Sequence, residues 1–437
     1  MTSLQEAMIS PTEVLADPVF EMWFKKRIYV MKVLILSTYE HTGGAAIAAE
    51  RLLQALQRNG VEAKMLCRRN LTWWKGKPQS WTSIIERAVI WAANGFSKRD
   101  LWATDTALIG QDITRTKEYQ EADVIHLHWI NQGFISLDTI DKILNSGKKV
   151  VMTMHDMWYC TSICHHSYGC SKYSSGCHDC KMLLKPGQND LSAKVFEKKC
   201  RVFSGKNYSI TAVSHWLADK AKESKFLNKE AISVIPNFID LNSIAIHDRK
   251  ECRRKLGISE DTLVITFCAA RIDAPIKGFD MLTEALLVFM KKYHETHQNI
   301  QLLLIGGIKD AKTLDSIPVP YRHFGMLNDR DVINHIYSAS NTVVSTSHFE
   351  TFGQTLIEAQ ACGCMPVSFG NSGQRDVIKH KENGYLVEEQ TAEAFAEGIH
   401  WALTEGQKKD RMLLRKSVEE HFSEETVTRQ FLDLYNR

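Results

Sequence analysis

The chain has 437 residues, of which 44% are hydrophobic and 24% are charged, the ordinary composition of a globular protein. This composition excludes a collagen, a coiled coil and a disordered tail protein. The formal net charge of +3 is too small to indicate nucleic-acid binding, so we expect no nucleic-acid partner. No apolar run approaches the roughly 18 residues that cross a bilayer. At roughly 150 residues per domain, the length suits three domains or two large α/β domains.

The first 30 residues lack the continuous apolar segment of a secretory signal. Acidic residues interrupt them, and the first strong strand pattern begins at Lys32. We therefore expect residues 1–30 to be an N-terminal arm or an extension from an upstream start, with Met31 as the alternative start. Without a signal, we expect a reducing, cytoplasmic location.

Short apolar runs alternate with helical patterns from residue 32 onward. The runs are rich in Val, Ile and Leu, which is typical of parallel strands covered on both faces. Strands are predicted at 33–36, 63–67, 124–127, 150–154, 209–213, 232–235, 264–268, 302–305, 342–345 and 365–367, and helices include 45–59, 280–293 and 355–361. This alternation predicts a parallel α/β fold.

The pattern breaks at Pro236, where a strand ends, and new strand–helix units begin near Leu263. We therefore predict a first domain over residues 31–238 and a second over residues 239–405. The charged helical tail, 406–437, is expected to pack back on the first domain.

The strongest chemical signal follows the predicted strand at 342–345. Gly353, Gln354 and Thr355 open a helix, and free backbone N–H groups at such a helix start favour a phosphate. Glu350 precedes the helix and Glu358 lies about one turn inside it. We expect Glu350 to lie in a cleft and Glu358 to accept hydrogen bonds from two sugar hydroxyls. The alternative is a plain strand-to-helix turn with capping glutamates.

Two cations follow the predicted strand at 264–268. Arg271 lies near its carboxyl end, and Lys277 precedes the helix at 280–293. Cations at the carboxyl end of a strand suit a pyrophosphate. The alternative is a pair of exposed cations in a loop.

The first domain offers a small-residue turn and several histidines. Gly43 and Gly44 follow the first strand, and their lack of side chains lets a ligand approach the backbone closely. His155 ends the strand at 150–154, at the mouth of a cleft if the sheet is parallel. His126 and His128 end another strand, where facing an acceptor and a structural role are equally open.

The segment from Glu350 to Glu358 resembles the Glu-x7-Glu motif of the retaining glycosyltransferases of family 4. The resemblance extends through most of residues 31–400 and implies the GT-B fold, with two Rossmann-like parallel-sheet domains facing a cleft. It implies that Glu350 contacts the donor sugar and Glu358 the ribose. Backbone amides from Phe352 through Gly353 and Gln354 to Thr355 would then hold the phosphates.

The same resemblance assigns the remaining candidates. It places Arg271 and Lys277 on the leaving nucleoside diphosphate, His155 at the donor sugar, and Gly43 and Gly44 beneath the donor phosphate and the acceptor. Family members are often discussed in terms of same-face attack, in which the donor phosphate takes the acceptor proton.

The resemblance implies transfer from a UDP- or GDP-sugar to a glycan or lipid-linked saccharide, as in bacterial lipopolysaccharide or capsule synthesis. No metal cofactor is expected for transfer, because the Asp-x-Asp sequence at Asp329 and Asp331 suits a helix cap. Ser214 is likewise predicted to cap a helix. Two alternatives remain open: a GT-B nucleotide-sugar epimerase or hydrolase, and a non-enzymatic, zinc-stabilised binding protein.

Five of the eleven cysteines lie in an insert at residues 160–180. Cys177 and Cys180 form a C-x2-C pair, and Cys164 and Cys170 complete a plausible tetrahedral zinc site. Substitute ligands are Cys160, His165, His166 and His178. Free thiols, a redox pair and an iron–sulfur site are the alternatives. The insert resembles a Cys-rich segment in some family-4 enzymes that build bacterial surface polysaccharides of the colanic-acid type.

A tryptophan-rich, basic region suggests a membrane surface. Tryptophans stand at 73, 74, 81, 91 and 102, Ile84, Ile85, Val89 and Ile90 have helical spacing, and Lys75, Lys77, Lys98 and Arg99 flank them. Residues 181–206 add an excess of five positive charges. Such a surface suits peripheral binding to the inner face of the cytoplasmic membrane. The alternative is a core-facing helix beside a solvated charged face.

Overall fold

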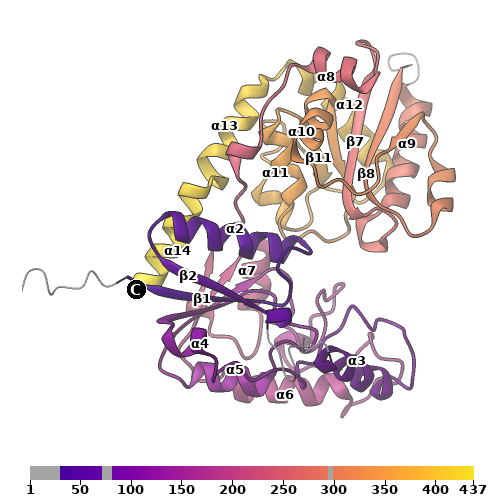
Figure 1. The fold of residues 1–437 in the computed structure, drawn as a ribbon. Coiled ribbons are helices and arrows are strands. Elements are labelled where there is room, and N and C mark those ends of the chain that lie inside the picture. Colours follow the sequence, from indigo (N-terminus) through magenta and orange to yellow (C-terminus); the bar gives the residue numbers. More distant parts are fainter. Residues whose placement is uncertain (1–29, 71–80, 294–298) are drawn as a thin grey trace, which may run out of the picture.

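The computed structural model describes residues 30–70, 81–293 and 299–437. They form two six-stranded sheets, one above the other in Figure 1, and all pairs of neighbouring strands are parallel. This confirms the predicted fold class. The first sheet has the order β2-β1-β3-β4-β5-β6. Its strands are β1 (Lys32–Ser37), β2 (Glu62–Cys67), β3 (Val124–Leu127), β4 (Lys149–Met154), β5 (Ser209–Ala212) and β6 (Ile232–Val234).

The second sheet has the order β12-β11-β10-β7-β8-β9. Its strands are β7 (Leu263–Arg271), β8 (Ile300–Gly307), β9 (Tyr321–His323), β10 (Thr342–Ser345), β11 (Met365–Phe369) and β12 (Tyr385–Val387). The edge strands β9 and β12 were not among the predicted strands. Each has three residues, and the exposed Tyr321 and Arg322 of β9 interrupt any apolar run, so neither carries the continuous pattern of a central strand.

Helices cover both faces of each sheet, as the strand patterns require. In β1, Leu34 and Leu36 face the core with α5 and α6, whereas Val33 and Ile35 face α2 and α14. The helices of the first half are α2 (Gly44–Arg58), α3 (Trp81–Ala93), α4 (Lys117–Glu121), α5 (Leu137–Leu144), α6 (Leu191–Phe203) and α7 (His215–Lys222). Those of the second half are α8 (Arg249–Leu256), α9 (Phe279–Tyr293), α10 (Arg330–Ala339), α11 (Gln354–Ala361) and α12 (Ala392–Leu403).

The C-terminal helices return from the second sheet to the first. The chain descends through α13 (Arg411–Phe422) to α14 (Glu424–Asn436), which lies beside β1 in Figure 1. Val427 and Phe431 are buried in the same core as Val33 and Ile35. Burying a large apolar side chain contributes about 1.5–3 kcal/mol. This apolar contact therefore fixes α14 to the first sheet.

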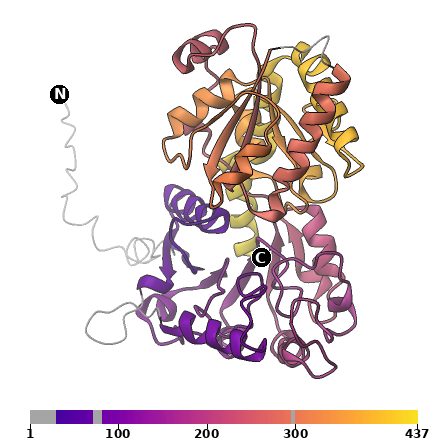
Figure 2. The same cartoon turned by 90° about the vertical axis from the view of Figure 1, so that its right-hand side faces the viewer.

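The strand order locates a ligand site in each sheet. The order in which strands are added to the sheet reverses between β1 and β3 in the first sheet, and between β7 and β10 in the second. Ligands of open parallel sheets bind outside the carboxyl ends of the strands at such reversals. Figure 2 shows the two sheet domains stacked with α2 between them. Both reversals therefore point to the junction of the domains.

No helix in the described part of the chain combines the length and apolarity needed to cross a bilayer. Residues 1–29 of the predicted arm lie outside the described residues, as do Trp73, Trp74, Lys75 and Lys77 of the predicted membrane surface.

Candidate active site

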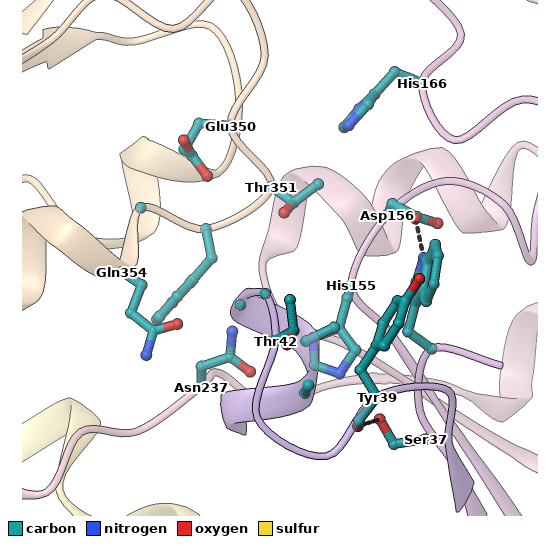
Figure 3. A pocket seen from close by; sticks show the side chains of 17 residues that line it. Ser37, Tyr39, Thr42, His155, Asp156, His166, Asn237, Glu350, Thr351 and Gln354 are labelled. Atoms are coloured by element: carbon teal, nitrogen blue, oxygen red, sulfur yellow. Dashed lines mark hydrogen bonds between the residues drawn. The ribbon is translucent and has the colours of Figure 1, made fainter. Parts of the chain in front are cut away.

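A cavity of about 430 Å³ lies between the two domains (Figure 3). The first domain contributes the loop after β1 and the carboxyl ends of β3 and β4, and the second contributes the turn between β10 and α11. The residues that line it include Ser37, Tyr39, Thr42, Gly43, Gly44, Trp129, His155, Asp156, His166, Asn237, Glu350, Thr351, Phe352, Gly353 and Gln354. Seven of the predicted site residues are thus brought together: Gly43, Gly44, His155, Glu350, Phe352, Gly353 and Gln354.

Two helix N-termini open onto this cavity from opposite domains. Gly43 precedes α2 with φ of 91°, and Gly353 precedes α11 with φ of 101°, a backbone region that favours glycine. Neither helix start receives a side-chain cap from the described residues. A Cβ added at Gly44 would lie 3.9 Å from Oε1 of Gln354, so the two helix starts are neighbours. Their free N–H groups and dipoles together suit an anion with several oxygens.

Lys277 is connected to the cavity by an ion pair with Glu350, which lines the cavity. Its Nζ lies 2.8 Å from Oε2 of Glu350, and Ser347 donates to the same oxygen at 3.4 Å. The negative charge of Glu350 raises the pKa of Lys277, against the effect of burial. Lys277 therefore remains charged at neutral pH. Lys277 itself does not line the cavity.

Glu358 stands behind the cavity wall and joins the two domains. Its Oε1 accepts from Nη2 of Arg51 in α2 at 3.2 Å and from Nη1 of Arg330 in α10 at 3.0 Å. The Glu358 side chain is 11% exposed. The predicted ribose ligand is therefore already oriented by two guanidinium groups. The sequence analysis did not identify Arg51 or Arg330, because they become neighbours of Glu358 only through the domain arrangement.

Arg271 and Thr355 do not line the cavity. The side chain of Arg271 is 52% exposed and its Nε lies 3.3 Å from Oδ1 of Asp273. Arg271 thus lies at the carboxyl end of β7, as its position in the sequence indicates, but it is paired with its own loop.

Three histidines form a chain from the cavity to the C-terminal helix. Nε2 of His155 lies 2.9 Å from Nδ1 of His128, and the His126 and His128 rings are 4.3 Å apart. Nδ1 of His126 lies 2.6 Å from the hydroxyl of Tyr435. Burial lowers the pKa of His155 to about 4 and that of His126 to about 3, so both rings are neutral at physiological pH. His155 therefore presents a neutral imidazole to a ligand.

Asp156 is held by three donors. Its Oδ2 accepts from Nε1 of Trp129 at 2.8 Å and lies 2.8 Å from Nδ1 of His165, while Oδ1 accepts from the N–H of Trp158 at 2.8 Å. Burial raises the pKa of Asp156, but the positive charge and hydrogen bond of His165 outweigh it and hold the pKa below its usual range. A dashed line in Figure 3 marks the hydrogen bond that Asp156 accepts from Trp129. Both of its oxygens are engaged.

An aromatic wall closes the first-domain side. The rings of Tyr39 and Trp129 stack with centroids 6.1 Å apart, and the guanidinium of Arg68 lies 5.3 Å from the Tyr39 ring. The sequence analysis did not assign a role to Tyr39 or Asp156, whereas Trp129 follows the strand of His126 and His128, where facing an acceptor and a structural role were equally open. Their signal was present, since each directly follows the carboxyl end of a parallel strand.

The predicted helix caps are confirmed. Asp329 caps α10 by accepting from the backbone N–H groups of Asp331 and Val332. Ser214 caps α7 by accepting from Leu217. The Asp-x-Asp sequence is therefore a helix start, as predicted. His215, next to Ser214, binds Asp376 of the second domain.

The four predicted zinc ligands lie in the first domain, away from the main cavity. Cys164, Cys170, Cys177 and Cys180 line one smaller cavity of about 80 Å³, and all four are free thiols. No three of their sulfur atoms lie within 4.8 Å of one another.

Both halves of the chain match glycosyltransferase domains. The family model described as "Glycosyltransferase Family 4" matches residues 42–243, and the one described as "Glycosyl transferases group 1" matches residues 248–417. By its fold and by both domain sequences, the chain belongs to the GT-B glycosyltransferases.

Individual relatives are distant. D-inositol 3-phosphate glycosyltransferase of Geodermatophilus obscurus is 26% identical over 223 residues, which are 47% of this chain and 49% of that protein. The chain thus spans about half the length of this curated relative.

Solved structures match over nearly the whole chain. HepE of Anabaena, in complex with UDP and glucose, has a TM-score of 0.59 at 16% identity and covers 93% of this chain and 99% of its own. WaaG, a glycosyltransferase involved in lipopolysaccharide biosynthesis, has a TM-score of 0.59 at 14% identity, with 92% and 99% covered. At these identities the likeness shows the fold.

Proposed function

We propose that the chain transfers a sugar, with retention of configuration, from a nucleoside-diphosphate sugar to a saccharide acceptor. The observation that carries the proposal is the pair of uncapped helix N-termini, at Gly43 and Gly353, that face each other across one cavity. Two such termini offer a diphosphate a set of N–H donors from both domains. Lys277 and Glu350 add a charged pair at the cavity wall.

The donor would be a UDP- or GDP-sugar. The bound UDP in HepE supports a uridine nucleotide, but that ligand belongs to HepE. We would measure the binding of UDP and of GDP to the purified chain by calorimetry, with EDTA present. Tight binding of one nucleotide would support a metal-independent donor site and identify the base. Failure of both nucleotides to bind would overturn the proposal.

Retention by same-face attack fits the state of the two carboxylates in the cavity. A double displacement needs a free carboxylate on the far face of the sugar. Both oxygens of Asp156 are engaged, and Glu350 is paired with Lys277. The anomeric configuration of the first product, measured by NMR, tests this step. An inverted product would contradict it.

The acceptor would be a glycan or lipid-linked saccharide of bacterial surface polysaccharide synthesis. The role of WaaG in lipopolysaccharide biosynthesis is consistent with this proposal. Donor consumption must then depend on the acceptor. An epimerase or hydrolase would consume the donor alone, and a binding protein would consume none, so a donor assay with and without acceptor separates the three functions.

The outer face of α3 supports action at a membrane surface. This helix turns its charged residues inward: Glu86 is buried and accepts from the N–H groups of Thr106 and Ala107, and Arg87 bonds to Asp105. Its outer face carries apolar side chains, including Ile84 at 69% exposure. A helix that is polar inside and apolar outside requires an apolar neighbour.

Further exposed apolar and basic residues extend this face. Phe96 and Trp102 are 66% and 65% exposed, and Leu184 is 48% exposed. Beside them lie the exposed cations Lys98, Arg99, Lys181 and Lys185. Aromatic side chains among cations match the interface of an anionic bilayer. We propose that this face, on the first domain, binds the inner leaflet of the cytoplasmic membrane.

Vesicle flotation tests the membrane face. At low salt we expect the chain to float with vesicles containing phosphatidylglycerol, and to float less with phosphatidylcholine alone. The double variant Ile84→Ser, Phe96→Ser should lose flotation. Leu287→Ser, which removes a 56% exposed leucine from α9 of the second domain, is the matched control and should retain it. Equal flotation of both variants would contradict the assignment.

A further inference from the structure

The segment between β4 and α6 is held in place with almost no regular secondary structure. From residue 155 to residue 190 it contains a single 3-10 helix, Lys172–Ser174. Long connections of this kind within a compact domain are uncommon and usually serve a function. Four thiols of the segment, those of Cys164, Cys170, Cys177 and Cys180, line one cavity. Two of the four, Cys177 and Cys180, also pack against the hydrophobic core of the first domain.

Backbone N–H groups donate to two of these sulfur atoms. The backbone N–H of Ser162 donates to Cys177, and that of Met182 donates to Cys180. The Thr161 hydroxyl donates to the backbone carbonyl oxygen of Cys164 at 2.5 Å. Donors aimed at sulfur stabilise a thiolate relative to a neutral thiol. Thiolates are the form in which cysteine binds zinc.

A buried cation beside the cluster lacks an ionic partner. The side chain of Lys199 is fully buried, and its Nζ donates to the carbonyl oxygens of Trp158 at 2.5 Å and Thr161 at 3.0 Å. Within the described residues, no carboxylate oxygen lies within the 4.0 Å of an ion pair with this ammonium. A buried charge without a counter-charge is costly. Burial lowers the pKa of Lys199 to about 7, and Cys160, Cys164, Cys177 and Asp105 act on it electrostatically in the opposite direction.

We propose that Cys164, Cys170, Cys177 and Cys180 bind one structural zinc ion. Four thiolates and Zn²⁺ carry a net charge of −2, which supplies the counter-charge that Lys199 lacks. Binding exchanges the four thiol protons for one metal ion, with no change of oxidation state. The spacing of Cys177 and Cys180 is the C-x2-C of structural zinc sites.

The loops must contract to complete this site. Zn–S bonds of about 2.3 Å place the sulfur atoms of a tetrahedral site about 3.8 Å apart. No three of the four sulfurs lie within 4.8 Å of one another. Gly169 and Gly176 precede Cys170 and Cys177, and a glycine leaves the backbone of each loop free to adjust.

A second group of potential ligands is less suitable. His247, Asp331 and His335 do bring three ligand atoms within 4.8 Å of one another. However, Nζ of Lys255 lies 3.0 Å from Nε2 of His335. An ammonium this close to the imidazole of His335 opposes the binding of a cation beside the ring.

The zinc site would fix one wall of the active-site cavity. The loop between Cys164 and Cys170 carries His165, which binds Asp156, and His166, which lines the cavity. Tyr168 of the same loop packs edge-on against Phe349 of the second domain, with centroids 5.5 Å apart. A metal ion at the base of this loop would therefore position residues at the domain junction without contacting a substrate.

Metal analysis of the full-length purified chain tests the proposal. We expect about one zinc per chain by mass spectrometry after dialysis against metal-free buffer. Cobalt added after zinc removal should give an intense near-ultraviolet thiolate charge-transfer band and the visible bands of a tetrahedral site. Cys177→Ser should lose the zinc and weaken the thiolate band. The control is Cys160→Ser, because Cys160 is fully buried, donates to the carbonyl of Met157 and lies outside the cavity.

Each outcome decides the proposal. Zinc retained by Cys160→Ser and lost by Cys177→Ser would support it. A wild-type chain that contains no stoichiometric zinc and gives no tetrahedral cobalt spectrum would overturn it, as would equal zinc in both variants. The wild-type cobalt spectrum decides even if Cys177→Ser fails to fold. If the wild type contains no zinc but binds UDP, the zinc site is overturned and the proposed donor site is not affected.

Discussion

Nζ of Lys277 lies 2.8 Å from Oε2 of Glu350, and this ion pair connects the loop after β7 to the loop after β10. Because these loops flank the reversal point of the second sheet, the pair lies where a sugar diphosphate would meet the second domain. The two side chains are 30% and 20% exposed, so the pair contributes little to folding stability.

We therefore expect Lys277→Ala and Glu350→Ala each to abolish most of the transfer while leaving the fold intact. Losing one electrostatic contact to the leaving group lowers kcat about 100- to 1000-fold. Steady-state kinetics and thermal unfolding of both variants check this expectation. Near-wild-type turnover in both variants would refute the assignment of these residues to the donor site.

The carboxylate of Glu358 provides a second test. If it binds the ribose, Glu358→Gln should weaken UDP binding about 10-fold, because hydrogen bonds to charged groups contribute about 1.5–3 kcal/mol. Glu424→Gln is the matched control. Glu424 also binds an arginine of α2, Arg58, but does so outside the cavity. Calorimetry with UDP should show a change for Glu358→Gln and none for Glu424→Gln. Equal affinities would exclude Glu358 from the nucleotide site.

The sequence was sufficient to predict most of the fold and about half of the site. Central strands such as 302–305 are continuous apolar runs, so their position and parallel pairing follow from the apolar pattern. The glycine-bearing helix start at Gly353 could likewise be predicted, because it follows a strand and is flanked by Glu350 and Glu358. The edge strands β9 and β12 could not be predicted, since three residues are too few to carry a pattern and two of those in β9 are exposed.

Contacts between residues far apart in the sequence could not be predicted, for a different reason. Arg51 and Glu358 are separated by 307 positions, and the contact depends on how the two domains meet. The inward-facing charges of α3 were also unexpected, because Glu86 and Arg87 find their partners in the loop at 104–109 rather than in solvent. In both cases tertiary contacts, and not local propensity, decide the role of the residue.

The substitution Gly43→Ala tests whether the start of α2 lies close to the bound donor. Its φ of 91° makes any Cβ unfavourable by about 1–2 kcal/mol, although the space around it is open. Gly60 has φ of 78° and equally open surroundings, but lies outside the cavity. Gly43→Ala and Gly60→Ala should therefore lose similar stability, measured by urea unfolding. Only Gly43→Ala should raise KM for the donor. A rise in KM for both variants would show that backbone strain, and not proximity, is responsible.

The histidine chain predicts how stability changes with pH. Burial lowers the pKa of His155 to about 4, whereas an unfolded histidine titrates near 6.5. Between these values the unfolded state binds more protons, so this group's contribution to the free energy of unfolding increases as pH rises from about 4 to 6.5 and is constant above. The slope for one proton is at most about 1.4 kcal/mol per pH unit.

Other groups titrate in the same pH range, and a variant without the His155 imidazole separates the contribution of His155 from theirs. Glu86 acts in the opposite direction, because burial raises its pKa to about 7, so its contribution to stability declines as pH rises from about 4.5 to 7. We would therefore compare the wild type with His155→Gln, which cannot titrate, by urea unfolding from pH 4.5 to 7.5. The difference in the free energy of unfolding between the wild type and His155→Gln should become smaller as pH falls, because only the wild type loses stability through protonation of His155. A difference that stays constant across this range would show that His155 does not change its protonation there.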